Sequence, residues 1–220
     1  MPFGVKARLV QEKTAIGFYL SGHLFDEVET EVRRFAKRRI DDLMDSREPQ
    51  LLAAILSDLR VINGNRGKLI IFKLDDKTDV LEASVDEATF NTNRHLLKDD
   101  ELVIVQGTLQ GASERFGRRF KVTQVWDLDT ARCKFGKYLR VAVNGTAPDI
   151  SRLVRDFPPR REMSEQGEML RGLPVRLSLR REGAAAELQL GDAAKFYPTD
   201  AALASWMAQA DRGLVQIVYD

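Results

Sequence analysis

The spacing of apolar residues changes from a helical to an alternating pattern near residue 50. Up to about residue 45, apolar side chains such as Val28, Val32 and Phe35 recur every three to five residues, as they do along one face of a helix. After Leu51, apolar and β-branched stretches alternate with short polar turns, which is typical of strands. The pattern predicts a helical lead-in segment over residues 1–48, followed by a strand-rich domain.

Five strands and one helix are predicted between residues 49 and 132. A short helix at about 87–97 separates the third expected strand from the fourth. The expected strands are residues 51–62, 68–74, 79–85, 101–110 and 118–129. A five-stranded Greek-key barrel with its helix between strands three and four is an OB fold, so we predict an OB-fold domain over residues 49–132.

The remaining residues, 133–220, are predicted to form a separate small α+β domain. The pattern gives a strand, a helix, two strands, a helix and a final strand, with residues 162–169 as a polar excursion. This order is typical of a split βαβ unit, in which helices cover one face of an antiparallel sheet. The expected fold class is therefore α+β and β: a helical segment, an OB-fold barrel and a split-βαβ domain.

Basic residues gather at two predicted turns of the barrel, although 34 basic and 33 acidic residues leave the whole chain with a net charge of only +1. Residues 63–67 join the first two strands and residues 111–117 join the last two, and in an OB fold these loops flank the ligand face. Cations beside exposed aromatic rings suit single-stranded DNA, because the cations neutralise phosphates and the rings stack on bases. The candidate residues are Arg60, Asn65, Arg66, Lys68, Phe72, Lys73, Arg115, Phe116, Arg118, Arg119 and Lys121, with Phe120 as a further aromatic. The alternative is that the charges only solvate the strands and the phenylalanines fill the barrel core.

The sequence offers no residue pattern expected of a catalytic, metal or cofactor site. Asp75, Asp76 and Asp79 share one turn, whereas two-metal chemistry needs carboxylates that converge from different elements. The two histidines have no second ligand at zinc spacing, and Cys133, the single cysteine, fits a reducing compartment. No apolar run reaches the roughly 18 residues of a membrane helix. We therefore expect a non-catalytic, cytoplasmic protein without cofactor, metal or membrane.

Nearly the whole chain resembles the C-terminal third of the bacterial DNA polymerase III alpha subunits. The most specific match is GFYLSGH at residues 17–23, and NRGKLIIFKLDDKTDVLEASV at residues 65–85 follows within the expected barrel. Leu24 stands where many members of the family have proline. The resemblance implies an OB domain near single-stranded template DNA and a terminal domain that docks the tau subunit of the clamp loader, among other replisome subunits. In that family the catalytic aspartates lie upstream.

The last helix and strand carry the residues that we expect to contact such a partner. Apolar side chains on these two elements are Leu203, Trp206, Met207, Val218 and Tyr219, and tryptophan often anchors protein interfaces. The alternative is that Leu203 and Trp206 pack on the domain's own sheet.

Two other functions fit the residues. An anticodon-binding OB module of a tRNA synthetase would also present basic turns, but it would be followed by a class II catalytic core. A scaffold whose OB face binds only protein is the other alternative. Our prediction is a non-catalytic portion of a replicative DNA polymerase that binds single-stranded DNA through its barrel and tau through its tail.

Overall fold

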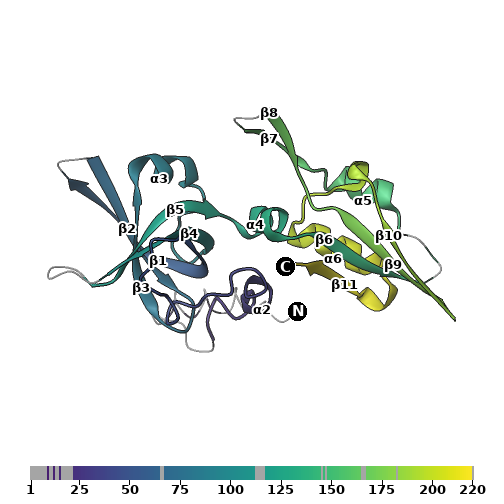
Figure 1. The fold of residues 1–220 in the computed structure, drawn as a ribbon, viewed down its shortest axis with the longest axis horizontal. Coiled ribbons are helices and arrows are strands. Elements are labelled where there is room, and N and C mark those ends of the chain that lie inside the picture. Colours follow the sequence, from purple (N-terminus) through teal and green to yellow (C-terminus); the bar gives the residue numbers. More distant parts are fainter. Residues whose placement is uncertain are drawn as a thin grey trace. The chain divides into compact units, whose positions relative to one another are not determined.

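The structure is a computed structural model that divides into two compact units, residues 1–128 and 129–220 (Figure 1). It describes residues 9, 12, 15, 22–64, 67–111, 117–144, 146, 148–164, 167–181 and 183–219. Helix α4 (Leu128–Phe135) begins at the border between the units, and the predicted border at residue 132 falls inside this helix. Among the described helices, none is long and apolar enough to cross a membrane.

Five strands of the first unit close into a barrel, which confirms the predicted OB fold. Their order around the barrel is β1-β2-β3-β5-β4, and β4 pairs back onto β1. All neighbours are antiparallel except β3 and β5. The elements are β1 (Gln50–Gly64), β2 (Gly67–Asp75), β3 (Val80–Asp86), α3 (Glu87–Asn93), β4 (Leu102–Gln110) and β5 (Arg119–Trp126). Helix α3 lies between β3 and β4 in the chain, as an OB fold requires.

Two local irregularities allow the strands to curve into a closed barrel. Strand β1 pairs first with β4 and then with β2, and its register shifts between Ser57 and Arg60, where Asp58 adopts a left-handed backbone with φ of 54°. A second shift lies beside Gly107 in β4. A Cβ atom at Gly107 would lie 2.1 Å from the carbonyl oxygen of Lys121, so only glycine fits this approach. Such bulges bend strands and increase their twist.

Between residues 22 and 48, the described part of the lead-in segment is less helical than its apolar spacing predicted. Helix α2 (Glu29–Val32) is short and has turns on both sides, and the described residues 36–49 contain no helix, so the expected helix to about residue 45 is wrong there. The physical reason is tertiary. Ile40 and Leu43 pack into the barrel core, and the N–H of Ile40 donates to the Asp76 carboxylate at 3.1 Å instead of continuing a helix.

The second unit contains a four-stranded sheet in the order β10-β9-β6-β11, with helices α5 and α6 packed into one core with it (Figure 1). The elements are β6 (Tyr138–Val143), α5 (Ile150–Asp156), β9 (Val175–Arg181), β10 (Ala184–Gln189), the short helix η1 (Asp192–Ala194), α6 (Asp200–Gln209), the short helix η2 (Asp211–Gly213) and β11 (Val215–Val218). The predicted strands and helices occur in the predicted order, with two further strands between α5 and β9, and the α+β class is confirmed.

The strand order differs from that of a split βαβ unit in one respect. Strands β6 and β9 are parallel and adjacent, so no strand lies between them and the expected split is wrong. Their buried residues form a continuous apolar layer from Leu139 to Val143 and from Val175 to Leu177. Strand β10 is exposed at every position, which suits an edge of the sheet and would not suit its centre.

A hairpin replaces the polar excursion expected at residues 162–169. Strands β7 (Arg160–Ser164) and β8 (Gly167–Arg171) pair as a separate two-stranded sheet (Figure 1). The sequence pattern does not predict these strands, because Glu162 and Glu168 lie within them and charged residues dominate the stretch. The ion pair between Arg171 and Glu162, at 2.6 Å, helps to join the two strands.

Candidate nucleic-acid interface

Outward-facing residues of four barrel strands form one continuous surface, which we call the barrel face. Cross-strand pairs in the ladder point to the same side of a sheet, so the register defines the surface. The pairs run from Arg60 opposite Ile71 and Ile62 opposite Leu69 to Ser84 opposite Lys121. The barrel face consists of Arg60, Ile62, Leu69, Ile71, Lys73, Glu82, Asp86, Arg119 and Lys121, and Ser84, which lies among them in the register, is buried.

The centre of the barrel face is aliphatic. Ile62 is 48% exposed and its cross-strand partner Leu69 is 39% exposed, while Ile71 next to them is half-buried. Exposed large aliphatic side chains on adjacent strands give a patch against which a flat ligand can pack. The patch was not predicted from the sequence, because its side chains are aliphatic and the expected base contacts were aromatic, although the alternation of Arg60 and Ile62 was a usable signal.

Most cations at this surface already have carboxylate partners. The Lys73 ammonium lies 2.7 Å from Asp58, and the Arg60 guanidinium lies 3.5 Å from the same carboxylate. Arg119 is paired with Glu82, with its Nε 2.7 Å from the carboxylate. The two pairs with Asp58 are exposed, and exposed ion pairs typically contribute about 0 to 1 kcal/mol each, whereas the side chain of Arg119 is mostly buried. A phosphate group could therefore replace Asp58 at little cost.

The other predicted cations have different surroundings. Lys68, at the start of β2, pairs with Glu87 at 3.3 Å. Arg118 donates through Nη2 to the backbone carbonyl of Leu43 at 2.7 Å, so it braces the lead-in segment against the barrel. Lys121 is exposed and lies near Asp86. The pKa of Asp86 is lowered, mainly because its carboxylate accepts a hydrogen bond from the N–H of Thr89 at the start of α3, with a smaller effect of Lys121.

The structure contradicts the prediction that phenylalanines of the strands stack on bases. Phe72 and Phe120 are fully buried in the barrel core, because they alternate with the outward residues of β2 and β5. The prediction for Phe72 was wrong, and the alternative of a core position is confirmed. Asn65, Arg66, Arg115 and Phe116 lie outside the residues that the structure describes. The described barrel face therefore contains cations and aliphatic side chains but no aromatic ring.

The turn between β2 and β3 holds the lead-in segment. Asp76 is fully buried, and its carboxylate lies 2.7 Å from Arg33 and accepts from the N–H of Ile40 and the hydroxyl of Thr78. Burial by itself would raise the pKa of Asp76, but the hydrogen bonds from Thr78 and Arg33 outweigh it, so the pKa is lowered.

Neighbouring contacts continue this anchoring. Asp75 lies 3.1 Å from His23, and Lys77 lies 2.6 Å from Asp26 and 3.0 Å from Glu29. In the part of the chain that the structure covers, no group of three or more His, Cys, Asp or Glu side chains is arranged to hold a metal ion. The carboxylates of this turn thus serve tertiary contacts.

In the second unit, the predicted partner-docking residues separate into core and surface. Trp206 is fully buried and its ring lies 5.5 Å from that of Phe196, so its prediction as an interface anchor was wrong. Leu203 and Tyr219 are half-buried against the same core. Met207 is 48% exposed, and Val218 is half-buried. Helix α6 buries the face that carries Trp206, which leaves Met207 as its main apolar residue at the surface.

Comparison with curated proteins finds relatives along nearly the whole chain. The DNA polymerase III alpha subunit of Pseudomonas aeruginosa is 33% identical over 217 residues, which are 98% of this chain and 18% of that protein. The chain is related to the DNA polymerase III alpha subunits. The subunit of Neisseria meningitidis is 32% identical over 83% of the chain, and that of Escherichia coli is 26% identical over 90%. The resemblance found in the sequence is confirmed.

This chain spans less than a fifth of the length of these relatives, between 16% and 18%. No protein-family model matches the chain. Among solved structures, the single-stranded-DNA-binding domain of a Synechococcus protein has a TM-score of 0.34 and 11% identity over 39% of the chain and all of that domain. At this score the assignment of the OB fold rests on the strand order of the barrel itself.

Proposed function

We propose that this chain is a non-catalytic, C-terminal part of a replicative DNA polymerase whose barrel face binds single-stranded DNA. The observation that carries the proposal is the barrel face, where Arg60, Lys73, Arg119 and Lys121 surround an aliphatic centre on the outer surface of an OB barrel. OB folds commonly bind oligonucleotides across the outer surface of strands two and three. The names of the relatives support a role in DNA synthesis.

The carboxylates on and around this surface predict weak, salt-sensitive binding. Asp58 and Glu82 compete with phosphates for the same cations, so a phosphate binds Arg60, Lys73 or Arg119 only by displacing a carboxylate from it. Aliphatic side chains support the bases without the strong stacking that an aromatic ring supplies. We infer that this barrel positions a template strand that other parts of the polymerase also hold.

Single-stranded DNA binding is tested by salt titration of the full chain. The variant R60E/K73E should lower the slope of log affinity against log salt by about 1.4, since each lost phosphate contact contributes about 0.7 on single strands. Fluorescence anisotropy with a labelled oligothymidylate reports both affinity and slope. The control K37E/R39E makes the same change of charge at two exposed residues of the lead-in segment. Equal slopes for both variants would contradict the proposed face.

We further infer that the second unit docks the tau subunit of the clamp loader, together with other replisome subunits. This part of the proposal comes from the family resemblance, and Met207 and Val218 are the predicted residues with accessible apolar surface. The variant Met207→Glu should reduce binding of tau to the full chain in surface plasmon resonance, because it places a charge in the expected contact. Met163→Glu, at a methionine that is 82% exposed on the β7–β8 hairpin, is the matched control. Unchanged binding by Met207→Glu would move the docking surface away from α6.

The absence of catalysis is also a proposal with a direct test. The full chain should neither extend nor degrade a primer when it is incubated with primed template, nucleotides and magnesium or manganese. The reason is that Asp75 and Asp76, which were considered as metal ligands, instead pair with His23 and Arg33 of the lead-in segment. An activity that disappears in D75N would overturn this expectation.

A further inference from the structure

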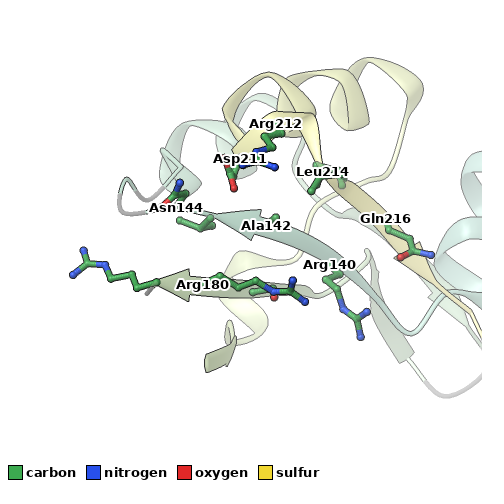
Figure 2. A pocket seen from close by; sticks show the side chains of 12 residues that line it. Arg140, Ala142, Asn144, Arg180, Asp211, Arg212, Leu214 and Gln216 are labelled. Carbon is green, nitrogen blue, oxygen red and sulfur yellow. The ribbon is translucent and has the colours of Figure 1, made fainter. Parts of the chain in front are cut away.

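A basic groove lies in the second unit, on the face of the sheet opposite the helices. Residues that alternate with the buried positions of β6 and β9, such as Arg140, Ala142, Ser178 and Arg180, line it, and η2 closes one side (Figure 2). The groove has a volume of about 740 Å³, within the range of about 300 to 1,000 Å³ that is typical of ligand sites. It lies where the adjacent parallel strands β6 and β9 end.

The charge of the groove is strongly positive. Arg140, Arg180, Arg181 and Arg212 line it together with a single carboxylate, Asp211. Arg180, Arg181 and Arg212 make no ion pair with any residue that the structure describes. Arg140, which also hydrogen-bonds the hydroxyl of Tyr138 at 3.1 Å, lies 3.6 Å from Glu187 on β10. Three guanidinium groups are therefore available to an anion, unlike most cations of the barrel face.

The backbone supports this arrangement. Ligands of α/β sheets bind beyond the carboxyl ends of parallel strands, where the loops diverge, and Asn144 and Arg181 occupy those positions here. Arg212 has a left-handed backbone with φ of 51°, a strained conformation for arginine that is often found at functional positions. This conformation belongs to the turn of η2 that carries Arg212 to the edge of the groove (Figure 2).

The chemistry of the groove selects a phosphate ligand. Guanidinium groups match phosphate oxygens with two parallel hydrogen bonds, and the amides of Asn144 and Gln216 add neutral donors beside them. Protein interfaces depend on buried aromatic and apolar anchors. The groove contains no aromatic side chain among its lining residues, and its largest exposed apolar residue is Leu214.

We propose that this groove binds the phosphodiester backbone of DNA, as a second DNA contact that is independent of the barrel face. Single-stranded and double-stranded DNA share this chemistry, and each is one arm of the test. The site goes beyond the proposed function of the chain, because it assigns a nucleic-acid contact to the unit that is otherwise expected to dock protein. The strands, the short helix η2 and their four arginines all lie within one compact unit.

The test uses charge reversal in the full chain. The variant R180E/R212E should lower the slope of log affinity against log salt by about 1.4 if the groove binds single-stranded DNA and by about 1.8 if it binds the duplex, since each lost phosphate contact contributes about 0.7 or about 0.9. Labelled oligothymidylate and a labelled duplex are titrated separately by fluorescence anisotropy. The matched control R152E/R155E makes the same change of charge at two exposed arginines of α5. The control should leave both slopes unchanged.

The same variant in the R60E/K73E background separates this proposal from the proposed function. If R180E/R212E lowers the salt slope equally in the wild-type and the R60E/K73E backgrounds, the groove binds DNA independently of the barrel face. This conclusion holds whatever effect R60E/K73E has by itself. Binding that is unchanged by R180E/R212E, or lowered equally by R152E/R155E, overturns the proposal. If polyglutamate at equal charge binds the groove more tightly than either DNA, the groove takes an acidic protein segment, which also overturns it. Circular dichroism melts check that each variant remains folded. If R180E/R212E does not fold, R180Q/R212Q replaces it and should also lower the slope.

Discussion

The two basic surfaces of this protein differ in how their cations are partnered. On the barrel face, Lys73 and Arg60 share Asp58, and Arg119 is held by Glu82. In the groove of the second unit, Arg180 and Arg212 have no carboxylate partner among the described residues, and Asp211 is the only acid in the lining. A count of basic residues in the sequence ranks the barrel higher, whereas the structure leaves more free positive charge in the groove. Availability of a cation, and not its presence, decides how strongly a surface attracts phosphate.

The largest expected effects concern the two cores that carry these surfaces. Trp206→Ala should destabilise the second unit by about 3 to 5 kcal/mol, the usual cost of removing a buried aromatic side chain, and should leave the barrel folded. Phe72→Ala should destabilise the first unit by a similar amount and should leave the second unit folded. Hydrogen exchange of the two units in each variant measures the effect, because it resolves opening of one unit from opening of the other. If either substitution opened both units equally, the surfaces could not be treated as independent.

The next effect concerns the buried pair that anchors the lead-in segment. Asp76→Asn should destabilise the first unit by about 3 kcal/mol, because it leaves Arg33 without its charged partner. The folded-state pKa of Asp76 lies below its usual value, so the ionised carboxylate stabilises the fold above the unfolded pKa of about 3.9. That stability is lost as the pH falls through the folded pKa.

Urea denaturation between pH 2 and pH 6 checks this prediction. The stability of the wild-type protein should fall on acidification below about pH 4, and the difference from Asp76→Asn should shrink over the same window. A difference that stays constant down to pH 2 would mean that the carboxylate charge contributes nothing to the anchor. This pair is the buried counterpart of the exposed pairs on the barrel face.

The smallest effect tests the comparison of the two surfaces directly. Asp58→Asn frees Lys73 and Arg60 and should raise affinity for single-stranded DNA by about fivefold, with a change in folding stability of less than about 1 kcal/mol. Asparagine tolerates the left-handed backbone at this position. Asp211→Asn in the groove should raise affinity less, because this carboxylate holds none of the arginines in a described ion pair. Anisotropy titrations at one salt concentration compare the two, and a larger gain from Asp211→Asn would reverse our view of the surfaces.

Local pattern predicted the strands of both units because alternation is a property of a few neighbouring residues. The stretch YLRVAV was expected as a strand and is β6 over the same residues, Tyr138–Val143. The same kind of reasoning failed for the β7–β8 hairpin, where the strands are charged and do not cover a core. It also failed for residues 36–45, because Ile40 satisfies its backbone N–H with Asp76, a residue far along the chain.

The sequence by itself determined the family, the barrel and the order of the strands and helices that enclose the two cores, since each depends on residue identity and short-range periodicity. Only the tertiary structure decided which face of each strand points outward. It placed Phe72 and Trp206 in cores, paired Lys73 with Asp58, and left Arg180 and Arg212 in an open groove. These outcomes depend on strand register and on the neighbours of β6 and β9, which bring together residues distant in the chain. Burial of a side chain and pairing of a charge depend on tertiary packing. The charged residues can therefore be identified from the sequence, but which of them can bind phosphate is decided only by the structure.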